Sequence, residues 1–370
     1  MIIKEYTISN LSDELLTGDL WKYDIHPITK QRANSQIHNP RASENDVVLF
    51  VAYEGNKICG YLNILPDYFY KNNEPVKMGW IGSWWVDAEY RKKGVGGFLL
   101  LKALRFYKKK LAGTKYTPDA EKILNASGIF VKHETPRYGF IIIPDIYEMV
   151  VQKYALGSYM RVLKPVFIIL RTLMRIYVFF QRFFWLRKNY KNINSLQYEY
   201  VEFIDNQTAD IIQNYKDTYS TRKGRSELEW SIRYPWILMT PAGEVEDSKY
   251  YFSDYSDNYL RLNIKLMDGD RPAGFMMLRR MRDIIEVFHC YCAEEYHRFA
   301  AYVILFHVIK KKVNSVIVED RLLMKELHDL QFPFVRKYNT SRSTMISKML
   351  MDAVGGGVTL QAGDGEAVFL

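Results

Sequence analysis

The sequence predicts a mixed α/β fold in which two similar units are joined by a basic, amphipathic helical segment. The chain has 370 residues, which is about the length of two ordinary domains. Strand-like and helix-like stretches alternate through residues 1–145. The same order of elements returns in the second half, and this recurrence indicates an internal repeat.

The first half shows a strand and helical turns, and then three strands followed by a helix. In order, its expected elements are a strand at 2–8, helical turns at 11–21, strands at 47–53, 58–65 and 76–86, and a helix at 94–111. Gly55 and Asn56 provide the turn of a hairpin between the second and third of these strands. Phe98, Leu101 and Leu104 share one face of the helix, as the helical period requires.

The second half repeats this series, with strands expected at 259–267, 272–278 and 284–292 and a helix at 300–312. Residues 55–62 (GNKICGYL) and 269–276 (GDRPAGFM) share a turn glycine, a basic residue, a second glycine, an aromatic residue and a large apolar one. Residues 124–129 (LNASGI) correspond in the same way to 327–332 (LHDLQF). We therefore expect domains at 1–150 and 198–370, with a linker at 151–197.

The charge of the chain is concentrated in one place. Lys and Arg number 51 against 42 Asp and Glu, a net charge of +9, and residues 149–196 alone contain nine basic residues and no acidic one. The balanced remainder argues against a nucleic-acid-binding surface. Three cysteines give no disulfide framework, and the start MIIKEYTISN lacks the pattern of a secretory signal, so we expect a cytoplasmic location.

Residues 86–98 (VDAEYRKKGVGGF) carry the motif with the clearest chemistry. Its glycines allow close approach of a ligand to the backbone, and the start of the following helix offers N–H groups without partners. Arg91, Lys92 and Lys93 add positive charge at the same place. The strand, loop and helix thus occur in the order that a diphosphate site requires. The spacing matches neither the dinucleotide fingerprint nor the P-loop.

The arrangement Arg91-x-x-Gly94-x-Gly96 after a strand resembles the acyl-CoA-binding motif of the GNAT superfamily of N-acetyltransferases. The resemblance covers about residues 1–145. It implies acetyl-CoA as co-substrate. The residues that it places at the cofactor are Trp85 and Val86 along the pantetheine, and Arg91, Lys92, Lys93, Gly94, Val95, Gly96 and Gly97 around the phosphates. The second half has neither glycine nor basic pair at 292–301, so the resemblance implies one active site per chain and a degenerate second domain.

The resemblance also implies catalytic groups. The backbone N–H of Val86 stands where the family donates to the developing oxyanion. The family's tyrosine acid falls on Leu124, which leaves Tyr116 or Tyr138 as candidates. Asp67 is a candidate base. His26, His133 and a water chain are alternatives to it.

Two further segments invite interpretation. His289, Cys290, Cys292 and His297 show no metal-site spacing, so we expect core cysteines and no metal. Residues 165–190 form a helix with a cationic stripe and a wide apolar face. This helix lies either on an anionic membrane surface or buried between the domains.

The expected function is an N-acetyltransferase that acts on a primary amine. The amine belongs to a small or lipid-linked molecule, for instance an amino sugar or an envelope-glycan precursor, if the helix at 165–190 contacts a membrane. Two alternatives remain open. One is a non-catalytic CoA-binding or membrane-attached scaffold, and the other is an aminoacyl transferase similar to the tandem enzymes that build cell-wall peptide bridges.

Overall fold

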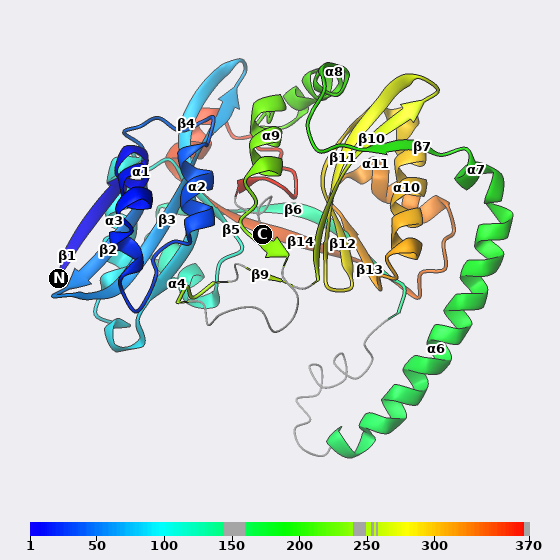
Figure 1. The fold of residues 1–370 in the computed structure, drawn as a ribbon, viewed down its shortest axis with the longest axis horizontal. Helices are drawn as coiled ribbons and strands as arrows, with labels where there is room; N and C mark the ends of the chain where they lie inside the picture. The colour runs from blue at the N-terminus through cyan, green and yellow to red at the C-terminus, as the bar shows by residue number, and fades with distance from the viewer. Residues whose placement is uncertain (144–159, 240–248, 253–254, 257, 366–370) are drawn as a thin grey trace. The chain divides into compact units, whose positions relative to one another are not determined.

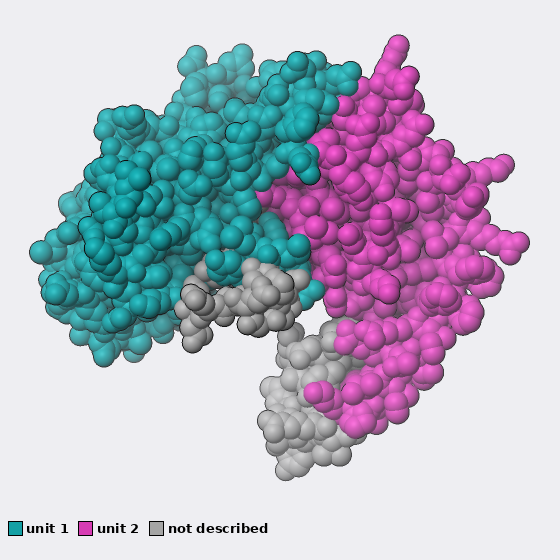
Figure 2. Space-filling view, viewed as in Figure 1, with its two compact units in different colours: residues 1–135, 202–259, 342–370 teal, residues 136–201, 260–341 magenta. Residues whose placement is uncertain are grey.

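The computed structural model describes residues 1–370 except 144–159, 240–248, 253–254, 257 and 366–370. Contacts divide the chain into two compact units, which Figure 2 colours separately. Unit 1 comprises residues 1–135, 202–259 and 342–370, and unit 2 comprises residues 136–201 and 260–341.

Unit 1 is built on a mixed sheet. Its strands, in order across the sheet, are β1 (Ile2–Thr7), β2 (Val47–Glu54), β3 (Lys57–Lys71), β4 (Glu74–Val86), β5 (Leu111–Thr114) and the end of β14 (Arg336–Ser347) (Figure 1). Neighbouring strands are antiparallel except β4 and β5, which are parallel. Because β4 and β5 run parallel, a helix must return the chain between them.

Helices cover both faces of this sheet. Leu99 and Leu104 of α3 (Val95–Phe106) and Leu124 of α4 (Pro118–Ala126) pack in one core cluster. Leu11 of α1 (Ile8–Thr17) and Ala33 of α2 (Lys30–Ile37) pack in another. The other helices of the unit are α8 (Asn206–Tyr215), α9 (Arg225–Arg233), α12 (Lys348–Val354) and the 3-10 turns η1 (Asp19–Trp21), η2 (Ala88–Tyr90) and η3 (Lys216–Thr218). A two-stranded ladder joins β8 (Leu238–Met239) to β9 (Tyr255–Ser256).

Unit 2 is built on a second set of strands. Its strands, in order across the sheet, are the end of β6 (Phe130–Ile141), β13 (Ser315–Val318), β12 (Ile284–Cys292), β11 (Arg271–Met281), β10 (Tyr259–Asp268) and β7 (Gln197–Tyr200). Its helical elements are α6 (Met160–Lys188), α7 (Tyr190–Asn194), η4 (Glu294–Tyr296), α10 (His297–Lys310) and α11 (Arg321–Asp329). An apolar cluster that includes residues of α10 and α11 forms a core in the described part of the unit.

The two units do not follow the domain boundaries expected at residues 150 and 197, because strands pair with partners from beyond those boundaries. Thr344 to Ile346 of β14, late in the chain, pair with β5 of the first series. Tyr138 to Ile141 of β6, early in the chain, pair with β13 of the second series. Each series therefore completes its sheet with the sixth strand of the other, so neither unit is one continuous segment.

Most expected elements are present with shifted ends. The strands expected in both halves all form, and β3 extends to Lys71 in a long hairpin with β4. The helix expected at 94–111 ends at Phe106, because the chain turns and enters β5 at Leu111. Helix α2 was missed because its buried residues include Arg32, Ser35 and Gln36, which give no apolar period.

Helix α6 packs on unit 2 through one narrow face. Val178 and Trp185 are buried there, and Trp185 Nε1 donates to the backbone oxygen of Leu330 at 2.8 Å. Residues 151–159 of the expected linker lie outside the described part of the chain. In the part that is described, we find no helix whose length and apolarity would let it cross a membrane.

Candidate active site

Strand β4 parts from β5 near the middle of the sheet of unit 1. The two strands pair from Gly79–Leu111 to Ile81–Gly113, and no pairing between them extends further along these described strands. The remaining residues of β4 continue beside β3, as far as the pair of Val86 with Gly60. The backbone edge of β4 from residue 82 to 86 thus faces a gap in the ladder, which is where a ligand can lie along a strand.

A β-bulge marks the point of separation. Leu62 pairs with Trp84 and Ile64 with Ile81, so two residues of β4, Gly82 and Ser83, stand opposite one residue of β3. A bulge bends its strand and increases the local twist. The bulge therefore accounts for the departure of β4 from β5.

The glycine loop continues directly from the open end of β4. After η2, the backbone takes positive φ at Lys92 (66°) and Gly94 (82°), and Gly94 caps α3 without a side chain. The first bond of α3 runs from the N–H of Phe98 to the oxygen of Gly94 at 3.0 Å. The N–H groups of Val95, Gly96 and Gly97 precede that bond, so they are available to an anion.

The charges around the loop favour a negative ligand. Arg91, Lys92 and Lys93 are all exposed. The nearby carboxylates share a cation, because Lys57 Nζ lies 3.1 Å from Asp87 and 2.8 Å from Glu89. The backbone N–H of Glu89 and then Lys57 lower the pKa of Asp87. Three cations and the positive end of α3 therefore face solvent together.

Two glycines hold α3 close to the strands. A Cβ atom on Gly60 would lie 3.0 Å from Val95 and 3.2 Å from the backbone oxygen of Trp85. A Cβ atom on Gly96 would meet Trp84 at 3.5 Å. The absence of a side chain at Gly60 thus lets the first turn of α3 sit against the end of β4.

Polar side chains gather at the bulge, and sequence reasoning missed them. The Ser83 hydroxyl is buried and accepts hydrogen bonds from Arg32 Nη1 at 2.9 Å and from the Tyr250 hydroxyl at 2.7 Å. The Arg32 guanidinium lies over the rings of Trp236 and Tyr250, at 4.8 and 4.9 Å. The Gly82-Ser83 pair inside an apolar strand was the one available signal. A buried guanidinium beside a hydroxyl can stabilise negative charge at this point.

The structure brings some of the expected site residues together. Val86 and Trp85 end β4 beside the loop, with the Trp85 ring stacked on Tyr61 at 5.4 Å. Tyr116 lies in unit 1 after β5, where burial raises the pKa of its hydroxyl and Ser343 lies nearby. Tyr138 belongs to unit 2, where it pairs with Val318.

Asp67 is fixed in a buried charge cluster at the other end of the β3–β4 hairpin. It pairs with Met78, on the far side of the β5 contact from the bulge. Its carboxylate accepts from Arg41 Nη1 at 2.6 Å and from Trp80 Nε1 at 2.8 Å. Although burial opposes it, the charges of Lys223 and Arg41 lower the pKa of Asp67. A carboxylate so stabilised in its charged form is a weak base.

The other expected groups are accounted for by packing. Burial lowers the pKa of His26, whose Nε2 lies 3.1 Å from the backbone oxygen of Trp21. Burial also lowers the pKa of His133, with Arg342 acting in the same direction. Leu124 is 1% exposed in the core under α3, so the position of the family's tyrosine is a packing position here.

The stretch of chain that carries this site matches a known family. Residues 15–122 match the sequence profile described as "Acetyltransferase (GNAT) family", and this match covers under a third of the chain. The matched residues run from α1 into α4 and include the bulge, the open edge of β4 and the glycine loop. This part of the chain is therefore similar to a GNAT acetyltransferase domain, and the similarity supports acyl transfer from CoA to an amine. No curated protein matches the sequence.

Several solved structures resemble the chain over most of its length. A protein of Enterococcus faecalis V583, described as a probable N-acyltransferase, matches with a TM-score of 0.50 and 10% identity over 95% of this chain and 73% of that one. A GCN5-related N-acetyltransferase from Anabaena variabilis ATCC 29413 matches with a TM-score of 0.47 and 13% identity, covering 93% and 72%. Saccharomyces cerevisiae N-myristoyltransferase with bound myristoyl-CoA gives a TM-score of 0.46 and 11% identity, covering 93% and 82%. At such identities the first of these likenesses shows the fold alone.

Proposed function

We propose that the protein is an N-acetyltransferase that transfers the acetyl group of acetyl-CoA to a primary amine. One observation carries the proposal: a helix N-terminus without a side-chain cap, next to three cations, stands at the open edge of a splayed strand. The loop amides and Arg91 would hold the pyrophosphate, while the backbone of Trp85 and Val86 would hold the pantetheine. The same observation disfavours an aminoacyl-tRNA-dependent enzyme, which has no need of such a loop.

The reaction needs three contributions from the protein. The acceptor amine must be neutral when it attacks the thioester carbonyl, the carbonyl oxygen needs a donor as it gains charge, and the departing thiolate needs a proton. Val86 supplies the backbone N–H in this proposal. Tyr116 is the candidate for the proton in this proposal, because a tyrosine hydroxyl carries its proton at neutral pH; burial raises its pKa further.

We also propose that unit 2 descends from the same kind of domain and has lost the CoA site. Gly274 pairs with Cys292 as Gly60 pairs with Val86, and β12 and β13 are parallel only from Ile284 to Glu286. In unit 2, however, η4 leads directly into α10 at His297, so the glycine loop has no counterpart. The one active site would therefore lie in unit 1.

Calorimetric titration and a turnover assay test this function. We expect the full-length protein to bind acetyl-CoA with a stoichiometry of one and to release free CoA when a suitable amine from a panel is added. Binding with no CoA release for any amine would favour the non-catalytic scaffold. Absence of binding would contradict the proposal and return the aminoacyl transferase to consideration.

Helix α6 presents an apolar face that the rest of unit 2 leaves open. Phe179, Phe180, Phe183 and Phe184 are between 52% and 65% exposed. On the opposite side, Arg182 is partly buried, and its Nη2 donates to the backbone oxygen of Val313 at 3.4 Å. The expected cationic stripe is thus turned partly toward the protein. The apolar face points outward, with exposed Arg187 and Lys188 at its end.

We propose that this face rests on an anionic membrane surface. A wide apolar face with cations at its margins is typical of a helix that lies in the plane of the lipid headgroups. Aromatic side chains favour the headgroup region, because their rings tolerate both the watery and the apolar side of it. A protein bound to the membrane surface would find its acceptor amine on a lipid-linked or envelope-destined molecule, such as an amino sugar.

Replacing Phe179, Phe180, Phe183 and Phe184 together by Ser should weaken binding to phosphatidylglycerol vesicles by more than about tenfold, because four exposed rings lose their apolar contact. Sedimentation with vesicles measures this. Phe203→Ser removes one ring that is 69% exposed in unit 1 and should leave binding unchanged. The membrane proposal fails if the wild-type protein does not sediment with these vesicles.

A further inference from the structure

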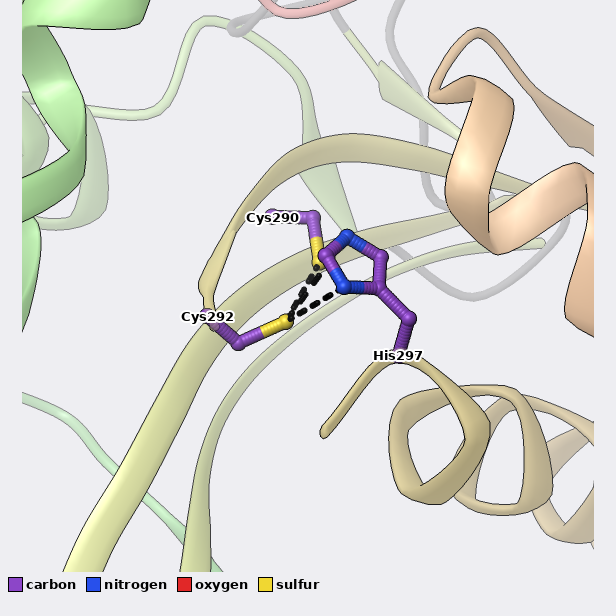
Figure 3. A group of neighbouring side chains, drawn as sticks. All are labelled: Cys290, Cys292 and His297. Atoms are coloured by element: carbon purple, nitrogen blue, oxygen red, sulfur yellow. Dashed lines mark hydrogen bonds between the residues drawn. The ribbon is translucent and has the colours of Figure 1, made fainter. Parts of the chain in front are cut away.

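Cys290, Cys292 and His297 meet in the interior of unit 2, as Figure 3 shows. The two sulfur atoms lie 3.7 Å apart, because residues i and i+2 of a strand point to the same face. The imidazole reaches Cys292 Sγ with Nδ1 at 3.7 Å and Nε2 at 4.0 Å. All three side chains are buried. The cysteines do belong to the core, as expected, but the structure adds an imidazole to them; His289 stacks on Tyr291 instead.

The fold explains why these groups converge. Cys290 and Cys292 lie on the part of β12 beyond its short pairing with β13, so their side chains stand where the two strands have separated. Helix α10 begins at His297 immediately after the η4 turn. The first residue of the helix is thereby placed over the end of the strand, with its ring directed at the sulfur atoms.

Neighbouring groups hold the imidazole in one orientation. Nδ1 lies 3.0 Å from the backbone oxygen of Ala293, so it can donate a hydrogen bond there and leave Nε2 as the nitrogen with a free lone pair. Nε2 lies 3.6 Å from Oδ1 of Asp320. Asp320 is itself fixed, because it caps α11 by accepting from the N–H of Leu323 at 2.7 Å. Such an outer hydrogen bond to the second ring nitrogen is usual for histidines that bind metals.

We propose that Cys290, Cys292 and His297 bind a zinc ion through their two sulfur atoms and Nε2. Two thiolates and an imidazole form a donor set that zinc favours. With Zn–S bonds of about 2.3 Å, tetrahedral geometry separates two sulfur ligands by about 3.8 Å, and the sulfur atoms here are 3.7 Å apart. The three ligand atoms all lie within 4.8 Å of one another.

Binding requires no oxidant or reductant. Both thiol protons pass to solvent as the two Zn–S bonds form, and the histidine binds in its neutral form. Three protein ligands leave the fourth position to a small ligand such as water. All three side chains are buried in unit 2, so we assign the site a structural role: it would tie the start of α10 to the end of β12 and so stabilise unit 2.

Metal analysis of the full-length protein tests the proposal. After zinc loading and removal of free metal, the wild-type chain should retain about one zinc ion. The Co²⁺-loaded protein should show the cysteinate-to-cobalt absorption in the near ultraviolet. Cys292→Ser should lose both signals. Cys59→Ser removes the third buried cysteine, which lies in unit 1, and should keep both.

Two more measurements guard against a variant that fails to fold. A strong chelator should lower the melting temperature of the wild-type protein, and zinc but not magnesium should restore it. His297→Gln should keep a cysteinate band in the cobalt protein but shift its visible bands, because one nitrogen ligand is lost. Wild-type protein that retains no zinc, or that carries a Cys290–Cys292 disulfide by mass spectrometry, would overturn the proposal.

Discussion

Acetyl-CoA should bind at least about a hundredfold more weakly to the double variant Arg91→Ala, Gly96→Asp than to the wild-type protein. A charge-assisted hydrogen bond contributes about 1.5–3 kcal/mol, and each 1.4 kcal/mol is about a tenfold change in affinity. The variant loses the Arg91 contribution and places a carboxylate among the N–H groups that would hold the pyrophosphate. Isothermal titration of acetyl-CoA measures the difference.

The fold should survive both changes. Arg91 is exposed, and its Nε makes only a 3.4 Å contact with the backbone oxygen of Val86. A Cβ atom at Gly96 finds ordinary contacts of 3.5 Å, and an acidic residue in the first turn stabilises a helix. Arg105→Ala, in the last turn of α3, is the matched control and should leave the affinity unchanged. An unaltered dissociation constant in the double variant would show that the loop is not the cofactor site.

The glycine loop could be located from sequence because its chemistry is local. Glycines, three consecutive basic residues and a following apolar helix lie within residues 86–98, and no distant contact is needed to interpret them. The open edge beside the loop needed the structure. It depends on the bulge at Gly82 and Ser83, and a bulge arises from the register of two strands rather than from one stretch of sequence.

Strand exchange between the two series could not be predicted. β6 and β14 each follow the last helix of their series, so the order of elements along the chain is the same for both. The periodicity of a strand indicates which face is apolar but not which neighbour it will join. The domain boundaries predicted at residues 150 and 197 followed the order of the chain. In the structure, β5 pairs with β14 and β13 pairs with β6, so each pairs with a strand of the other series.

Convergence of the Cys290 and His297 side chains was hidden by the position of a helix end. The sequence predicted a helix from residue 300, and a histidine before that point would lie in a loop. In the structure α10 begins at His297, so the imidazole ring of His297 is held at the first turn of the helix, against β12. Helix ends are the least certain part of a sequence-based assignment, and here a displacement of three residues decides whether a ligand set exists.

For α6, the spacing of charged and apolar residues predicted two faces but did not indicate which of them the rest of the protein covers. The burial of Trp185 and the partly buried Arg182 show that the narrower, mixed face packs on unit 2. Burial lowers the pKa of Arg182, and its side chain is accommodated by the backbone oxygen of Val313 and the ring of Phe332 at 5.9 Å. An arginine can lie along such a surface because its long stem is apolar.

Asp67→Asn should lower the free energy of unfolding of the protein by about 3–5 kcal/mol, the usual effect of breaking a buried ion pair. Asp67 and Arg41 are both nearly fully buried at 2.6 Å, and Arg41 also contacts Glu227 at 2.9 Å. Without the Asp67 charge, the buried cations Arg41 and Lys223 lose a partner. Urea unfolding at neutral pH measures the change. Asp13→Asn, at an exposed position on α1, should stay within about 0.5 kcal/mol.

The same variant should alter the response to acid. Although burial opposes them, cationic neighbours lower the folded-state pKa of Asp67 and Glu227. The stability that these two carboxylates give to the fold is therefore complete above their unfolded-state pKa of about 4. It is lost as the pH falls through the lowered folded-state values. Burial raises the pKa of Asp364, whose contribution therefore has the opposite sign: it opposes folding above that raised value and is relieved as the pH falls.

We expect wild-type stability to decline below about pH 4, as the two carboxylates whose folded-state pKa is lowered, Asp67 and Glu227, become protonated. Asp67→Asn removes one of the two and also removes a negative charge that raises the pKa of Asp364. The pH dependence of the unfolding free energy in the variant should consequently be shallower than in the wild-type protein. A variant that matches the wild type in both stability at neutral pH and acid dependence would mean that the Asp67 charge contributes nothing to unit 1.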